Sequence, residues 1–246
     1  MNKLKRGQVT IFIIVAIVLV VIVALYFVFR DSINVGSFGS KTHEVEAFVY
    51  DCIEEKGEKV IFGVALGGGH FSLLENSTVP RVTYYYVDGF NEMPSKLEIE
   101  EEISSVLEEK LIECTNNFID FANYEIDSNN PSVETEIGEE KIYLDINYPI
   151  KITKGKEVVV LREFEKNFDV RFGLIYDLVE KFLEDEFLEE GICLTCLVDL
   201  VSGNDLSFEL LDVDLVTTIF VIKDESSNMG EKEFEFVFAN EYSNGL

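Results

Sequence analysis

The N-terminal apolar segment places the strongest constraint on what this chain can fold into. Residues 9–29 are 21 consecutive residues without a charge, and Lys5, Arg6 and Arg30 flank them. As a helix with a rise of about 1.5 Å per residue, the segment would be about 31 Å long, which matches the hydrocarbon core of a bilayer. It is also longer than the apolar region of about 7–15 residues in a cleaved secretory signal. The segment therefore predicts a transmembrane helix over 9–29, preceded by a basic cytoplasmic leader over 1–8.

The charge distribution predicts how the chain is oriented. Residues 31–246 contain 16 basic and 47 acidic residues, a formal net charge of −31. Basic residues beside an apolar segment stay in the cytoplasm. We therefore expect a single-pass protein of the cell membrane with its N-terminus inside and its C-terminal domain outside. A domain this acidic repels phosphate, so we expect no nucleic acid among its partners.

The residues just before and at the start of the apolar segment carry a resemblance. "KRGQVT" has a basic pair, then Gly7 and Gln8, with Thr10 two positions after the glutamine. This opening resembles archaeal type IV pilin-like proteins, whose class III signal peptides share the pattern. The resemblance implies cleavage between Gly7 and Gln8 by a prepilin-type peptidase, and contact with copies of the chain or with other pilin-like subunits. Phe12 stands where the family often carries Glu, a difference that concerns filament assembly more than processing. The remainder resembles single-pass archaeal surface proteins with the same opening.

The rest of the chain divides into a linker and two predicted subdomains. Residues 30–42 contain glycine and serine and indicate a short linker. A helix–strand–helix subdomain is predicted over 43–124. Its first helix has an apolar stripe from Val45 and ends at the glycines that begin at Gly67, and its second follows a capping box of Ser95 and Glu98.

An antiparallel sheet with further helices is predicted over 125–246. Residues 142–146 alternate between apolar and polar, "TKGKE" favours a turn, and the next segment returns as a second strand. Two helices are expected near 174–182 and 193–200, and three more strands close the chain. Helices and strands cluster rather than strictly alternate, which argues against a doubly wound parallel sheet. The predicted fold class is α+β, a transmembrane helix followed by an extracytoplasmic domain of amphipathic helices and antiparallel sheet.

The four cysteines are the residues with the clearest chemistry. Cys52 and Cys114 each lie on the apolar stripe of a predicted helix, so the thiols meet if the two stripes face each other. Outside the cytoplasm they can oxidise to a disulfide. The alternative is two buried thiols that behave as small hydrophobic groups. Cys193 and Cys196 have the spacing of a redox motif but lack its strand–helix context, so a local disulfide or two core thiols is favoured.

No motif in the sequence predicts an enzyme, and we expect neither a cofactor nor a metal site. The glycines at 67–69 lack the frame of a phosphate-binding loop, and the two histidines are too few for a histidine-rich metal site. Asn76 begins a glycosylation sequon. We expect a membrane-anchored, pilin-like surface protein with a structural or interaction role. The alternative is a tethered extracytoplasmic module that binds a solute or metal without polymerising, and an exported thiol–disulfide protein is a more distant third.

Overall fold

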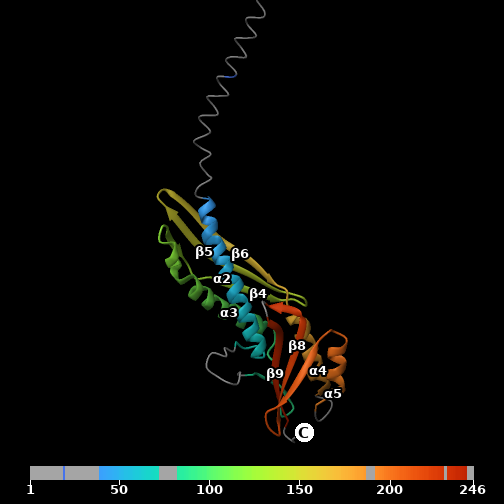
Figure 1. Cartoon of the computed structure of the whole chain (residues 1–246). Helices are drawn as coiled ribbons and strands as arrows, with labels where there is room; N and C mark the ends of the chain where they lie inside the picture. The colour runs from blue at the N-terminus through green and yellow to red at the C-terminus, as the bar shows by residue number, and fades with distance from the viewer. Residues whose placement is uncertain (1–18, 20–38, 72–81, 187–191, 230–231, 243–246) are drawn as a thin grey trace, which may run out of the picture. The chain divides into compact units, whose positions relative to one another are not determined.

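The structure is a computed structural model that describes residues 19, 39–71, 82–186, 192–229 and 232–242 (Figure 1). The chain separates into two compact units, residues 1–46 and residues 47–246. The described residues form an α+β fold with four α-helices and two sheets, as the sequence predicts. The helices are α2 (Gly39–Leu66), α3 (Lys96–Thr115), α4 (Phe172–Glu186) and α5 (Leu194–Ser202), and a 3-10 helix, η2 (Asn116–Phe121), follows α3.

The N-terminal part of the predicted fold class needs a correction. Among the described residues, no helix combines the length and the hydropathy needed to cross a bilayer. The predicted transmembrane helix over 9–29 lies outside the described residues, apart from Leu19. The fold class that the described residues support is therefore α+β, and the transmembrane part of the prediction finds no support among them. The described helix α2 begins at Gly39, within the expected linker of residues 30–42.

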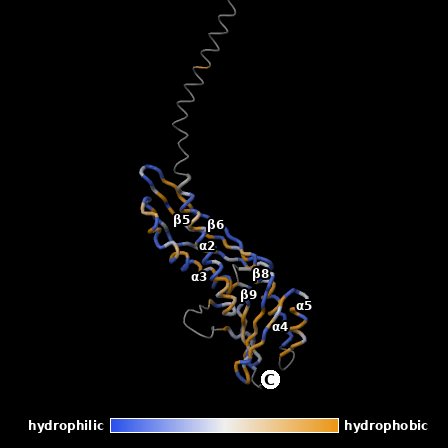
Figure 2. Tube along the Cα trace, in the orientation of Figure 1, coloured by the Kyte–Doolittle hydropathy of each residue, from blue (hydrophilic) through white to orange (hydrophobic). Residues whose placement is uncertain are grey.

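The smaller sheet is built around β5 (Ile142–Lys154), which pairs on both sides. β6 (Glu157–Phe168) runs antiparallel along one side of β5. On the other side, β4 (Ser132–Ile137) pairs with the first half of β5, and β3 (Glu125–Ser128) pairs with the second half. Hydrophobic and hydrophilic residues alternate along the first half of β5, as expected of a sheet with one covered face (Figure 2). The predicted antiparallel meander is confirmed, and β3 is an addition to it.

The larger sheet draws strands from both predicted subdomains. Its order is β2–β1–β9–β8–β7. The bounds are β1 (Tyr84–Val87), β2 (Phe90–Asn91), β7 (Ser207–Asp212), β8 (Thr217–Met229) and β9 (Lys232–Glu241). β7, β8 and β9 form antiparallel pairs, whereas β1 runs parallel to β9. A hairpin from the middle of the sequence therefore extends a sheet made by its C-terminal strands.

Close packing of α2 against the smaller sheet explains a glycine inside the helix. A Cβ added at Gly57 would lie 2.5 Å from the ring of Phe168 on β6, so a larger residue would force the helix away. Tyr50 of the same helix contacts Phe164, with ring centroids 5.3 Å apart. The helix ends before Gly68, whose backbone has a φ of +65° that favours glycine.

An aromatic cluster fills the interior of the larger sheet. Phe236 and Phe238 of β9 are fully buried, and Phe238 stacks on Phe220 of β8 with ring centroids 4.8 Å apart. Tyr85 of β1, the other neighbour of β9, also stacks on Phe238, with ring centroids 4.9 Å apart. Phe172, the first residue of α4, packs edge-on against Phe236 at 5.3 Å. These contacts hold β1 and α4 onto the C-terminal strands.

Candidate functional site

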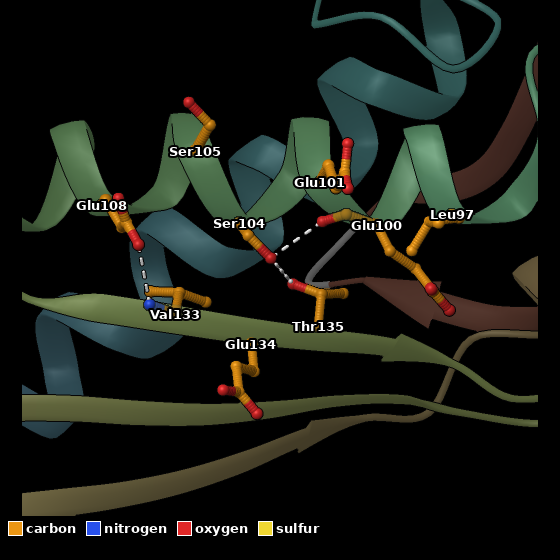
Figure 3. Close-up of a pocket in the computed structure, with 9 residues that line it drawn as sticks. All are labelled: Leu97, Glu100, Glu101, Ser104, Ser105, Glu108, Val133, Glu134 and Thr135. Carbon is orange, nitrogen blue, oxygen red and sulfur yellow. Dashed lines mark hydrogen bonds between the residues drawn. The ribbon is translucent and has the colours of Figure 1, made fainter.

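Helix α3 lies along the outer edge of β4, and its side chains bond to the backbone of that strand (Figure 3). The backbone N–H of Val133 donates to Glu108 Oε1 at 2.9 Å, and the N–H of Ile137 donates to Glu100 Oε1 at 2.8 Å. Between them, Ser104 Oγ lies 2.8 Å from Thr135 Oγ1. Ser104 Oγ also lies 2.8 Å from the carbonyl oxygen of Glu100. Residues four apart on α3 therefore contact every second residue along the edge of β4.

The repeat lengths of helix and strand explain this match. Four residues of an α-helix rise about 6 Å, and two residues of a strand advance about 6.7 Å. A helix row at i, i+4 and i+8 can therefore follow a strand edge at j, j+2 and j+4. The unpaired N–H groups of an edge strand need acceptors, and carboxylates supply strong ones. The glutamates of α3 take the place of a further strand and close this edge of the smaller sheet.

A hollow of about 340 Å³ opens between α3 and β4 beside these bonds. Its lining residues are Leu97, Glu100, Glu101, Ser104, Ser105, Glu108, Val133, Glu134 and Thr135. They offer carboxylates and hydroxyls beside apolar surface, and they include no histidine, cysteine or lysine. The described residues contain no group of His, Cys, Asp and Glu that is placed to hold a metal ion.

A second hollow, of about 400 Å³, lies on the outer face of the smaller sheet. Glu134, Asp145 and Glu165 occupy directly opposed positions on β4, β5 and β6. Like charges at opposed positions in a sheet destabilise it by a few tenths of a kcal/mol or more. Glu134 lines both hollows, so a continuous acidic surface runs from the α3–β4 edge over the sheet. This surface would attract cationic groups and repel anionic ones.

The structure contains the Cys52–Cys114 disulfide that the sequence favours, and of the two alternatives left open for Cys193 and Cys196 it contains the disulfide. Cys52 of α2 is joined to Cys114 of α3, with Cα atoms 5.9 Å apart. The bridge links the two helices of the first predicted subdomain. Cys193 is joined to Cys196 at the start of α5, and Cys193 serves as the N-cap of that helix. All four cysteines are therefore oxidised in the structure.

Glu186 is a buried carboxyl group that sequence reasoning did not identify. It is the last residue of α4 and only 1% exposed. Asn240 Nδ2 donates to Glu186 Oε2 at 2.7 Å, and the hydroxyl of Tyr242 donates to Oε1 at 2.9 Å. Burial raises the pKa of Glu186 to about 7, although these two hydrogen bonds act to lower it. A buried polar group such as this leaves little sequence signal, because its partners lie 54 and 56 residues away.

A buried ion pair joins the start of α4 to β8. The guanidinium of Arg171 donates through Nε to Asp224 Oδ2 at 2.9 Å, and its second bond reaches the other carboxylate oxygen. Ser227 also donates to this carboxylate. Burial acts to raise the pKa of Asp224, but the bonds from Arg171 and Ser227 outweigh it and leave the pKa below its usual value. This pair is positioned to hold α4 on the larger sheet.

Three predicted site residues cannot be placed. Gly7 and Gln8, at the expected processing site, and Asn76, in the expected sequon, lie outside the described residues. Comparison with protein-family models, with curated proteins and with solved structures found no match to this chain.

Proposed function

We propose that this chain is a membrane-anchored, pilin-like cell-surface protein whose acidic domain has a structural or interaction role outside the cytoplasm. The N-terminal apolar segment over 9–29 is the proposed means of attachment. The domain is stabilised by disulfides and presents acid-lined surfaces to other molecules. Its partners are the membrane and copies of itself or other pilin-like subunits.

The observation that carries the proposal is the oxidised state of all four cysteines. Disulfides persist in oxidising compartments and are rare in the reducing cytosol. The Cys52–Cys114 bridge closes a long stretch of chain, with a sequence separation of 62 residues. A bridge of this kind removes conformational freedom from the unfolded chain and so stabilises the folded domain. A domain exposed to the surroundings of a cell benefits from such a constraint.

Thiol labelling in intact cells tests the proposed location. The cells are treated with a membrane-impermeant maleimide, either directly or after a membrane-impermeant phosphine reductant. We expect labelling of the cysteines only after reduction. A cytoplasmic thiol protein of the same cells supplies the control, because its thiols should stay unlabelled until the cells are lysed.

Two results would contradict the location. Direct labelling of Cys114 without a reductant would show free thiols, and labelling that requires lysis would place the domain inside. Mass spectrometry of the purified protein tests the processing separately. Gln8 as the first residue supports the pilin-like route, and an intact Met1 contradicts it.

A second candidate function is a tethered module that binds a cationic solute or metal. The acid-lined hollow between α3 and β4 favours it, because its volume of about 340 Å³ could accept a small ligand. Because the described residues contain no group placed to hold a metal ion, calorimetric titration with a small organic polyamine tests this function. Glu101→Gln should weaken binding, whereas Glu109→Gln makes the same change at an exposed position of α3 outside the hollow and should not. Equal effects of both substitutions would indicate only general attraction to an acidic protein.

A further inference from the structure

Cations without an ion pair gather at the β5–β6 turn. Among the described side chains, five lysines and arginines form no ion pair. Four of them belong to this turn and its flanking strands, and the fifth is Lys181 on α4. We define the basic tip as Lys151, Lys154, Lys156, Val158, Val160 and Arg162. In a chain with a formal net charge of −27, such a cluster is an exception.

The basic tip also exposes apolar side chains. Val158 is 53% exposed and Val160 is 45% exposed, although both belong to a strand. Within the described residues β6 pairs only with β5, so its other edge is open. Lys154 lies over the ring of Tyr124, with Nζ 5.0 Å from the ring centroid, which orders one cation of the tip. Residues 151–162 carry four cations and one acid, Glu157, which lies opposite Lys154, so the tip combines a net positive charge with exposed hydrophobic surface.

The β7–β8 turn has the opposite charge and more apolar exposure. We define the acidic tip as Leu211, Asp212, Val213, Asp214 and Leu215. Leu215 is 86% exposed, and Val213 is 60% exposed. Asp214 fixes the loop, because its carboxylate accepts the backbone N–H groups of Val216 at 2.9 Å and Thr217 at 2.8 Å. These bonds lower the pKa of Asp214, so the loop keeps its negative charge.

The two tips lie at opposite ends of the unit formed by residues 47–246. The acidic tip is next to Glu241, which pairs with Thr217, and this end carries the mark of the C-terminus in Figure 1. The β5–β6 turn is at the other end of the unit (Figure 1). Most of the surface is acidic and repels other copies of the chain. The basic tip of one copy can nevertheless attract the acidic tip of another.

We propose that the acidic tip of one copy docks on the basic tip of a second copy. Leu215 and Val213 would cover the exposed valines, and Asp212 would meet the lysines of the turn. This contact rests on the proposed function and specifies how copies of the chain meet. A contact between two different surfaces is heterologous, so it can repeat from copy to copy along an open row. Pairing of two acidic tips or two basic tips would place like charges together.

Sedimentation velocity of the full chain tests the contact. The protein is kept in a mild detergent with micelles in excess, so that the apolar N-terminal segments occupy separate micelles. At about 0.15 M salt the screening length is about 8 Å, which suppresses long-range repulsion but leaves charges in contact effective. We expect reversible self-association. Leu215→Ser should weaken it at least about tenfold, because a leucine loses its burial.

A charge exchange makes the test specific. Lys156→Glu alone and Asp212→Lys alone should each weaken association about fivefold, and the two together should restore it. Lys181→Glu is the matched control, with the same change of charge at an exposed lysine outside both tips. Lys156→Glu and Lys181→Glu should keep the melting temperature of the parent, whereas Asp212→Lys also removes the acceptor of the Thr218 hydroxyl and should lower the melting temperature with or without Lys156→Glu.

Either of two results would overturn the tip contact. One is a chain that stays monomeric at the highest concentration reached, and the other is association that Leu215→Ser and Lys156→Glu leave unchanged. Neither result bears on the location of the domain, which the thiol labelling decides independently. Thiols that label without reduction would instead contradict the proposed function. The sedimentation data would still decide whether the tip contact forms.

Discussion

Replacing Glu186 by glutamine should remove a pH dependence of stability from the domain. The carboxyl lies at the C-terminal end of α4, where the helix dipole disfavours a negative charge, and it faces two neutral donors. The titratable group in contact with it is Tyr242, behind which lies the ring of Tyr86. Neither is a cation, so the ionised carboxylate is not compensated.

The size and sign of the effect follow from the pKa. Burial raises the pKa of Glu186 from 4.5 to about 7, so the folded state binds the proton more tightly than the unfolded state. The stabilisation is fully present below about pH 4.5 and is lost as the pH rises through about 7. Between pH 5 and pH 8 the free energy of unfolding should fall by roughly 2.5 kcal/mol from this group alone.

Urea unfolding at a series of pH values, with the disulfides intact, measures this contribution. The difference between the parent and Glu186→Gln should grow by about 2 to 3 kcal/mol between pH 5 and pH 8, with the variant more stable at pH 8. Glu184→Gln is the control, because it makes the same change at an exposed position of α4, and its difference curve should be flat. A flat curve for Glu186→Gln would show that folding does not raise the pKa of this carboxyl, and it would refute the prediction.

Three further outcomes are expected from denaturant unfolding. Replacing Cys52 and Cys114 by alanine together should lower the free energy of unfolding by about 4 kcal/mol, and an unchanged midpoint would show that the bridge does not form. Glu108→Ala should cost about 1 to 2 kcal/mol because the N–H of Val133 loses its acceptor, whereas Glu108→Gln should recover most of this; equal losses would contradict the hydrogen bond. Asp224→Ala should cost about 3 to 5 kcal/mol because it leaves a partly buried guanidinium unpaired, and a loss below about 1 kcal/mol would refute the role of that pair.

Local patterns in the sequence predict the helices and most strands correctly. The capping box at Ser95 and Glu98 is present, with Ser95 N–H donating to Glu98 Oε2 at 2.7 Å, and α3 begins where the box predicts. These features depend on residues a few positions apart. The disulfide between α2 and α3 was also predictable, because each cysteine lies on an apolar stripe and the two stripes had to cover the same core.

The pairing of strands far apart in the sequence was not predictable. The parallel pairing of β1 with β9 joins Tyr84 to Ala239, and no local pattern indicates a partner so far along the chain. An acidic run such as that of α3 ordinarily indicates a solvated helix face, so the sequence alone indicates no partner for these glutamates. Only the position of β4 reveals that Glu100 and Glu108 accept backbone N–H groups.

The central place of β9 in the larger sheet also constrains when the domain can fold. β9 lies between β1 and β8, so the strand that comes last in sequence order is the one that joins the other strands into a single sheet. Before residues 232–241 leave the ribosome or cross a membrane, the β1–β2 hairpin and the β7–β8 hairpin have no common partner. Long-range strand pairing of this kind is slow, and strand edges that stay unpaired until β9 is available promote aggregation. The acidic character of the chain keeps such incomplete molecules apart during that interval.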